Sequence, residues 1–407
     1  NPLPSDVFPW LQLAPRPLPY FVVERLPAPQ ILATGEVLER TESYHSDDLA
    51  ARMSLELPKP SNHTRIDNAE NILDDAGEAT PAMIHPISDE FSYDDWPGMH
   101  AATITIDAGS LINGRVTLDL TAEAGTVIDI GYAQILVDDR VIPYLSHRTM
   151  MADEFIAREG RQTLQTYNWR NFRYVLLTFR HHQNPVALHQ VRVESERYPF
   201  EETGAFACSD EMLNWTWQAC IKTAELCTYD RLMDNPIRER RQYTLDILCN
   251  LDAYYAAFGN PRIVDKYFTD ILHSQFAYGM FPNTVLGNSV EEFNVLVDGQ
   301  FELFFRVWQH YELLADRSML ERFYHPLQKV MELFQQYTDD HGLLGALPFT
   351  MFIDWADVDR TGTSLTINLL HADAWRVLAL IAGELGDDGK VEGYREHHQR
   401  LCRSEEH

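Results

Sequence analysis

The sequence predicts a two-part chain, an antiparallel, jelly-roll-like β-sandwich followed by a helical domain. Apolar residues recur with period two from Met99 to about Glu196, as in half-buried strands. After Phe200 the period becomes helical and stays so. The 407 residues exceed what one core usually takes, and 45% hydrophobic and 11% aromatic residues can fill two cores. We place the boundary at 199–204, where Pro and Gly flank two Glu residues.

Residues 1–94 form an N-terminal segment that is rich in proline and short of clear periodicity. Eight prolines fall within the first thirty residues. Proline interrupts helices because it lacks the backbone N–H and its ring clashes with the preceding turn. Long helices are therefore excluded, and we expect short β elements that can belong to the sandwich.

Residues 95–200 contain the main strands of the predicted sandwich. Apolar residues alternate with polar ones, which places one face of each strand in a core. Turn residues at Asp107–Gly109 and Ala124–Gly125 are expected to separate the first three strands. The predicted strands include 102–106, 116–120, 126–130, 174–179 and 191–193.

Residues 204–407 contain about seven predicted helices. Apolar residues at a spacing near 3.6 predict one helix between Leu213 and Leu226. Two loops, Gly279–Asn288 and Gly342–Thr361, are long enough to carry function. The further predicted helices are 240–258, 262–278, 292–315, 318–338, 365–385 and 388–402.

The charge balance excludes two classes of partner. Lys and Arg number 33 against 61 Asp and Glu, a formal net charge of −28. Nucleic acids and anionic membranes are bound mainly through Lys and Arg, so we expect neither.

No stretch reaches the roughly 18 continuous apolar residues of a membrane-spanning helix. The start at Asn1 lacks signal-peptide features, so a targeting segment is removed or absent and the compartment stays open. Nothing in the composition excludes a homo-oligomer.

The remaining Cys, His and Gly residues predict no metal and no nucleotide cofactor. His273, His310 and His371 lie on predicted amphipathic helices without a partner at metal spacing. The isolated glycines form no phosphate-binding loop. Asp298 is interpreted as a first-turn acid stabilised by the helix dipole. The cysteines are odd in number, lack C-x-x-C spacing and are interpreted as packing residues: Cys208, Cys220, Cys227, Cys249 and Cys402.

Three carboxylates, Asp234, Glu239 and Asp246, form the most informative cluster in the sequence. With Asn235 as N-cap and Pro236 as first helical residue, the segment predicts a helix start. Seven residues at about 100° each place Glu239 and Asp246 within roughly 20° of each other, on one face. Such acids are either solvated charges or, in a cleft, a group in which one carboxyl stays protonated and serves as a general acid. Glycoside hydrolysis needs such an acid and a second carboxylate.

These residues resemble the signature of glycoside hydrolase family 78, the α-L-rhamnosidases of the six-hairpin glycosidase superfamily. Asp234-x-Pro-x-Arg238-Glu239-Arg240, followed by Asp246, is similar to the family pattern D-C-P-x-R-(D)-E-R-x-G-W-x-G-D, shortened by one residue between Arg and Glu. The resemblance covers about residues 95–400. Other similar segments are Arg148 to Asp153, 167–175, 204–210, Phe352–Trp355 and 382–386.

The sequence departs from the family pattern at Asn235, in place of Cys, at Gln242-Tyr243, in place of Gly-Trp, and at Leu245, in place of the second Gly. Tyr243 keeps an aromatic wall of different shape, which leaves the exact sugar open. The resemblance implies an (α/α)6 toroid, which about seven helices would leave truncated. It also implies a general base from a later Glu, which we expect beyond residue 407. We therefore expect residues 1–407 alone to be inactive and poorly stable, with exposed apolar helix faces.

The resemblance also implies a role for each matched residue. Glu239 would be the general acid that protonates the departing glycosidic oxygen. The implied function is an inverting, exo-acting α-L-rhamnosidase whose partner is a rhamnose-containing glycoside or oligosaccharide. A catalytically inactive carbohydrate-binding relative, or another glycosidase or lyase on an α/α toroid, is the alternative. The residues that would bind the sugar are Asp234, Arg238, Tyr243, Asp246, Asp354 and Trp355.

Overall fold

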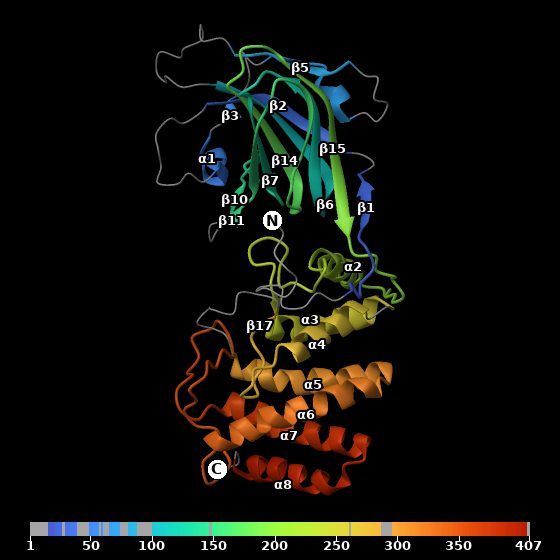
Figure 1. Ribbon diagram of the computed structural model, residues 1–407, viewed down its shortest axis with the longest axis vertical. Coiled ribbons are helices and arrows are strands. Elements are labelled where there is room, and N and C mark those ends of the chain that lie inside the picture. Colours follow the sequence, from blue (N-terminus) through green and yellow to red (C-terminus); the bar gives the residue numbers. More distant parts are fainter. Residues whose placement is uncertain are drawn as a thin grey trace. The chain divides into compact units, whose positions relative to one another are not determined.

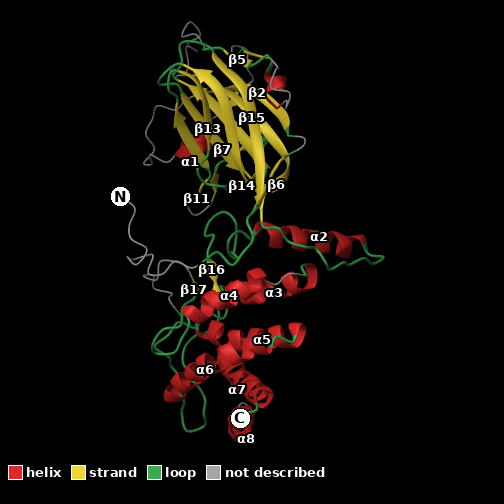
Figure 2. Ribbon diagram, turned by 45° about the vertical axis from the view of Figure 1, so that its right-hand side comes forward, coloured by secondary structure: helices red, strands yellow, loops and turns green. Residues whose placement is uncertain are grey.

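The chain divides into two compact units, which are described separately. A β unit contains Tyr20–Pro199 and Pro236–Glu239, and a helical unit is formed mainly by Phe200–Asn235 and Arg240–His407. Figure 2 shows strands in the first and helices in the second. Arg148 and parts of the predicted 95–200 and Gly279–Asn288 segments lie outside the described residues. The computed structural model describes residues 15–26, 29–38, 49–56, 58–59, 65–73, 80–87, 100–145, 149–259, 262–285 and 295–404.

The β unit is built from many short strands and a few long ones (Figure 1). Two short helical segments, α1 (Leu49–Leu55) and the 3-10 helix Ala69–Leu73, lie between strands. The strands are β1 (Val22–Arg25), β2 (Gln30–Leu38), β3 (Pro58–Lys59), β4 (Ile66–Asp67), β5 (Ala82–Ile84), β6 (His100–Ala122), β7 (Val127–Ala133), β8 (Leu136–Val137), β9 (Arg140–Val141), β10 (Tyr144–Leu145), β11 (Thr149–Met150), β12 (Ala152–Ile156), β13 (Gly160–Gln165), β14 (Arg170–Arg180) and β15 (Val186–Arg197).

The strands of the main sheet pair in the order β12-β7-β14-β6-β15-β5-β4. Strands β2 and β13 also pair with β6, and β1 pairs with β15. The ladders between the described strands of this sheet are antiparallel, which confirms the antiparallel class predicted from the period-two pattern. The strands between Val22 and Ile84 join the same sheet as those after His100, so the described N-terminal segment belongs to this unit.

The predicted turn at Asp107–Gly109 is wrong, because the segments 102–106 and 116–120 belong to one strand, β6. Gly109 has a φ of 82°, and its N–H donates to Asp107 Oδ1 at 2.7 Å. This local irregularity bends the strand without reversing it, since β14 pairs with β6 on both sides of it. The other predicted turn, at Ala124–Gly125, is present and separates β6 from β7, with a Gly125 φ of 95°.

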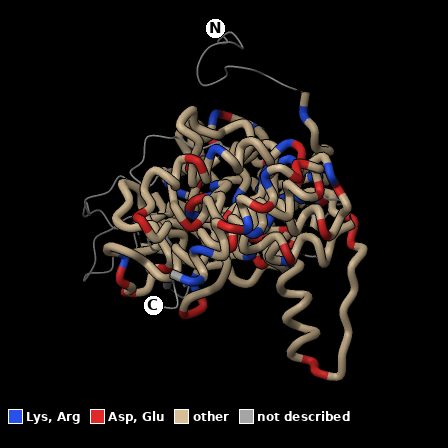
Figure 3. Tube along the Cα trace, turned by 90° about the horizontal axis from the view of Figure 1, so that it is seen from below, with Lys and Arg blue, Asp and Glu red and all other residues tan. Residues whose placement is uncertain are grey.

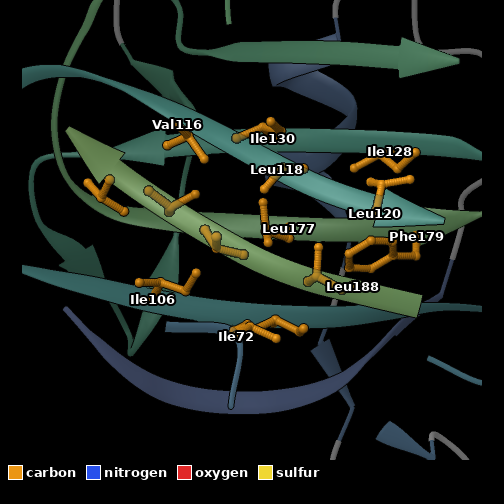
Figure 4. Close-up of a cluster of buried hydrophobic side chains, with 14 of the residues drawn as sticks. Ile72, Ile106, Val116, Leu118, Leu120, Ile128, Ile130, Leu177, Phe179 and Leu188 are labelled. Carbon is orange, nitrogen blue, oxygen red and sulfur yellow. The ribbon is translucent and has the colours of Figure 1, made fainter. Parts of the chain in front are cut away.

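The core of the β unit is formed by the inward positions of β6, β7, β14 and β15 (Figure 4). Leu118, Ile130, Leu177 and Leu188 are fully buried. Each such side chain contributes about 1.5–3 kcal/mol of transfer free energy. The alternation seen in the sequence therefore marks the residues that hold this unit together.

A buried ion cluster lies in the same unit. Arg180 is 1% exposed, and its guanidinium donates to Glu56 Oε2 and Asp129 Oδ2, both at 2.6 Å. Arg52 reaches the same Asp129 oxygen at 3.0 Å. Burial raises the pKa of Glu56, and the charge of Arg180 opposes that shift. Removal of the central guanidinium would leave two carboxylates buried without their main partner.

The helical unit contains the predicted helices. Seven helices follow Phe200 in the described residues, and the predicted 365–385 helix matches α7 at both ends. Two short strands, β16 (Gln242–Tyr243) and β17 (Thr284–Val285), pair in this unit. The helices are α2 (Glu211–Leu226), α3 (Thr244–Ala257), α4 (Arg262–His273), α5 (Val297–Leu314), α6 (Arg317–Phe334, followed by the 3-10 helix Gln335–Tyr337), α7 (Leu365–Leu385) and α8 (Asp388–Ser404).

Helix α7 is the most apolar element of the helical unit. Among the described residues it is the one helix long and apolar enough to cross a membrane by length and composition. Most of its length is buried, and it packs against α5, α6 and α8. Its residues Trp375 and Leu378 are buried in that core. The hydropathy of α7 is thus explained by its place in the core.

Helix α2 exposes more apolar surface than its sequence pattern predicts. It buries Ile221, Ala224 and Leu226 near its end, but Leu213 and Trp215 are more than half exposed.

The interpretation of the cysteines as packing residues is wrong for most of them. All five are free thiols, and Cys208, Cys220, Cys249 and Cys402 are exposed.

Candidate active site

The segment that carries the motif is a loop and not the predicted helix. Residues 236–239 form a turn, and α3 begins only at Thr244. Arg240 has a φ of 54°, in the left-handed region, which stops a right-handed helix from passing through it. Glu239 and Asp246 therefore do not share a helix face, and Asn235 is not an N-cap.

Tertiary contacts explain where α3 begins. Gln242 and Tyr243 pair with β17, which holds them in extended conformation. Thr244 donates its backbone N–H to the Asn283 carbonyl at 2.7 Å and its hydroxyl to the Pro282 carbonyl at 2.8 Å. These partners lie some forty residues away in sequence and so could not be seen from local pattern.

Asp234 closes the base of the loop. Its backbone N–H donates to the Arg241 carbonyl at 3.0 Å, and its Oδ1 accepts from the Arg241 backbone N–H at 2.9 Å. The Asn235 amide donates to the other carboxylate oxygen. Asn235, which replaces the family's Cys, thus has a structural partner. Asp234 has a loop-closing function that the sequence did not suggest.

Glu239 and Arg238 lie in the turn and form an ion pair with each other. The Glu239 side chain is 24% exposed, so it is mostly buried yet still reaches solvent, while Arg238 is about half exposed. A charged guanidinium beside a carboxylate fixes its orientation. The loop therefore carries one partly buried carboxylate, Glu239, paired with the neighbouring guanidinium of Arg238.

Asp246 and Tyr243 lie at the start of α3. Asp246 is exposed in the first helical turn, where the helix dipole favours a negative charge. Tyr243 is the half-buried N-cap residue. Gln242, which stands where the family has Gly, is 1% exposed and donates to Asp270 Oδ2 at 3.1 Å. Gln242 is therefore a structural residue of the helical unit.

Asp354 and Trp355 lie together on the long loop after α6. Trp355 is 87% exposed, and its ring packs edge-on against Phe352 with centroids 5.0 Å apart. Asp354 is exposed, and Arg360 fastens the loop by donating to the carbonyls of Phe352, at 2.9 Å, and Asp354. A wide apolar ring is thus presented to solvent beside a carboxylate.

Asp298 was missed as a residue of this region. It is 5% exposed and accepts from the backbone N–H groups of Phe352, at 3.2 Å, and Ile353, at 3.0 Å. It therefore fixes the loop that carries Trp355 to the first turn of α5. Burial raises the pKa of Asp298, and these amide donors oppose the shift. Burial also raises the pKa of Glu302, which lies one turn further along α5. The i, i+4 spacing of Asp298 and Glu302 was the feature of the sequence that could have indicated two acids on one face of this helix.

The histidines set aside in the sequence have different environments. His371 is 1% exposed, and its Nε2 accepts from the Trp375 indole N–H at 3.1 Å. Burial lowers the pKa of His371 to about 3. His273 is exposed at the end of α4. Among the described residues His371 Nδ1 has no hydrogen-bond partner, so only one of its ring nitrogens is satisfied.

Residues 201–404 match the sequence profile of the bacterial α-L-rhamnosidase six-hairpin glycosidase domain. The chain belongs to this family. The resemblance to glycoside hydrolase family 78 inferred from the 234–246 motif is thereby confirmed. The matched region contains all the predicted site residues, on both the motif loop and the Trp355 loop.

Family relatives agree with this assignment. An α-L-rhamnosidase of Streptomyces avermitilis is 26% identical over 303 residues, which cover 70% of this chain and 27% of that protein. The chain therefore spans about a quarter of the length of this curated relative.

Solved structures show the same fold. The family 78 rhamnosidase of Bacillus sp. GL1 has a TM-score of 0.70 at 22% identity, covering 86% of this chain and 34% of that one. A rhamnosidase from Klebsiella oxytoca, solved with rhamnose bound, has a TM-score of 0.68 at 14% identity, covering 94% and 70%. The fold of this chain is therefore similar to that of these two rhamnosidases.

Proposed function

We propose that this chain functions in an inverting, exo-acting α-L-rhamnosidase that removes terminal α-L-rhamnose from glycosides or polysaccharides. The observation that carries the proposal is the Asp234–Asp246 signature inside the 201–404 family match. The rhamnose bound in the Klebsiella relative supports a rhamnose-containing substrate. The structure adds a partly buried acid, Glu239, on a closed loop.

In the proposed reaction the Glu239 carboxyl donates its proton to the glycosidic oxygen. The bond from this oxygen to the anomeric carbon breaks, and the aglycone leaves as an alcohol. A water attacks the anomeric carbon from the opposite face after a second carboxylate takes its proton, which gives rhamnose of inverted configuration. The second carboxylate of inverting enzymes lies roughly 6.5–9.5 Å from the acid. We expect it from a Glu later in the sequence than the motif.

The sugar would be held by residues on both loops and on α3. Trp355 offers an apolar face to the ring of the sugar, and Tyr243 a second aromatic wall. Asp246 and Asp354 are exposed carboxylates that can accept hydrogen bonds from hydroxyl groups. Arg238 would orient Glu239 through their ion pair. In this proposal Asp234 acts chiefly by closing the loop, and its carboxylate would also accept a hydrogen bond from a sugar hydroxyl.

The acid assignment is tested by Glu239→Gln in the longest form of the protein that carries residues 1–407. Turnover of a rhamnoside with a poor leaving group should fall about 10²–10⁴-fold, because a positioned acid contributes that much. A rhamnoside whose leaving group needs no protonation should lose much less. Glu332→Gln, the same change at an exposed position on α6, is the control and should leave both rates unchanged. Near wild-type rates for Glu239→Gln would rule out the assignment.

The stereochemistry and the alternatives are separated by two further measurements. Proton NMR of the first-formed sugar distinguishes inversion from retention. An unmodified protein that binds rhamnose but hydrolyses none of a panel of glycosides would be an inactive carbohydrate-binding relative. Turnover of another glycoside in preference to rhamnosides would show that the toroid supports different chemistry.

A further inference from the structure

Three polar side chains from three helices converge in the helical unit. Asp265 lies in the first turn of α4, His310 lies on α5, and Asp316 is the N-cap of α6. One potential metal-ligating atom of each lies within 4.8 Å of the others. The three residues are far apart in sequence, so no motif spacing could reveal them. We refer to them as the His310 cluster.

The histidine of the cluster is buried and points at the two acids. His310 is 1% exposed, and its Nε2 lies 3.6 Å from Asp265 Oδ1 and 3.7 Å from Asp316 Oδ2. Both distances are too long for hydrogen bonds, and this buried nitrogen has no hydrogen-bond partner among the described residues. A buried polar atom is normally satisfied, so an unsatisfied nitrogen aimed between two carboxylates calls for a ligand.

The separations fit a bound cation. Ligand nitrogen and oxygen atoms lie about 2.1 Å from zinc, so two ligand atoms of a tetrahedral site are about 3.4 Å apart. The 3.6 and 3.7 Å separations are close to this value. A direct hydrogen bond from His310 to either carboxylate would bring nitrogen and oxygen to about 3.2 Å or less. Side chains that do not interact would have no reason to lie this close to one another.

The second ring nitrogen is held as a metal-binding histidine requires. His310 Nδ1 lies 2.8 Å from the Tyr255 hydroxyl oxygen. With a proton on Nδ1 donated to that oxygen, Nε2 presents its lone pair to the two acids, and such an outer contact fixes ring orientation in metal sites.

Charges around the cluster also favour a cation. Asp265 and Asp316 are about half and a third exposed, so the site is open to solvent on their side. The Arg322 guanidinium is held by another partner, since it donates to Thr269 Oγ1 at 2.7 Å. The two carboxylates of the cluster supply negative charge that a bound cation can balance.

We propose that Asp265, His310 and Asp316 bind a divalent transition metal, with zinc as the best fit. One imidazole and two carboxylates suit zinc better than calcium, which takes six or more oxygen ligands. Three protein ligands leave a position for water. The ion would tie the start of α4 and the start of α6 to α5 and so stabilise the helical unit.

The test is zinc titration of the 407-residue protein by calorimetry. One zinc ion should bind per chain, and Asp265→Asn and Asp316→Asn should each weaken binding at least about 100-fold, since even outer-sphere changes cost 10–100-fold. Asn is also a good N-cap, so Asp316→Asn should keep α6 intact. Tyr255→Phe should weaken binding about 10-fold through His310. Asp340→Asn, the same change at an exposed position elsewhere, is the control and should bind like the unmodified protein.

A second measurement distinguishes this site from scattered carboxylates of an acidic chain. Zinc should raise the melting temperature of the unmodified protein and of Asp340→Asn, but not of Asp316→Asn, because only an ion bound to the folded state stabilises it. Failure of the unmodified protein to bind zinc would overturn the proposal. Equal affinity in all variants would overturn it as well.

Discussion

The buried imidazole of His371 should make the helical unit sensitive to acid. Burial, with help from the positive charges of His397 and Arg400, lowers its pKa from 6.5 to about 3. In the unfolded chain the same ring titrates near its ordinary value. Between pH 6.5 and 3 the unfolded state therefore binds a proton that the native state does not, and the free energy of unfolding falls as the pH falls.

The size of the effect follows from the difference between the two pKa values. One pH unit corresponds to about 1.4 kcal/mol, so this group alone lowers the free energy of unfolding by about 2 kcal/mol at pH 5 and by about 4–5 kcal/mol near pH 3. Its contribution is fully present above pH 6.5. It is lost progressively as the pH falls through the window between the unfolded and folded values.

The perturbation that isolates this group is His371→Gln. A Gln oxygen can accept from the Trp375 indole as the imidazole does, at 3.1 Å in the native protein, but it does not titrate. The free energy of unfolding is measured by urea titration, followed by the circular dichroism of the helices, from pH 8 to pH 5. Over this range it should fall by about 2 kcal/mol less in the variant than in the unmodified protein. His273→Gln removes an exposed imidazole and should keep the slope of the unmodified protein. Parallel curves for His371→Gln and the unmodified protein would refute the argument.

Two other changes test one structural and one functional inference. Arg180→Met should destabilise the β unit by about 3–5 kcal/mol in chemical denaturation, because it strands two buried carboxylates, whereas Arg161→Met at an exposed ion pair should cost less than about 1 kcal/mol. Equal losses would contradict the importance of burial. Trp355→Ala should raise KM for a rhamnoside about 10-fold with little change in kcat, if its ring supports the sugar face. Trp215→Ala, at an exposed position on α2, should leave KM unchanged.

The sequence predicts regular elements well where the pattern is set by burial within the element itself. The α7 helix was placed correctly because its apolar residues continue over its whole length. Parts of strands β14 and β15, at 174–179 and 191–193, were predicted for the same reason, since alternate residues enter one core. Acidic residues occur along the described parts of the chain and are not gathered in one segment (Figure 3).

The errors occur where partners distant in sequence decide the backbone. Asp107–Gly109 has the composition of a turn, yet β6 continues through it because β14 pairs with both sides. The helix expected from Asn235 begins at Thr244 instead, since β17 holds the two preceding residues. The convergence of Asp265, His310 and Asp316 could not be predicted for the same reason, because the three side chains come from three helices. The chemical type of each residue was available from the sequence, but its neighbours were not.

The two loops that carry the family motifs share one construction, and this changes how Asp234 is interpreted. Each loop contains a non-glycine residue in the left-handed region, Arg240 with a φ of 54° and Ile353 with a φ of 57°. Such a conformation costs on the order of 1–3 kcal/mol and persists only where its surroundings fix it. In each case a carboxylate accepts the backbone N–H at or next to the strained residue, Asp234 from Arg241 and Asp298 from Ile353. The motif acid Asp234 and the overlooked Asp298 thus perform the same task, because both hold a strained loop in the shape that presents its side chains.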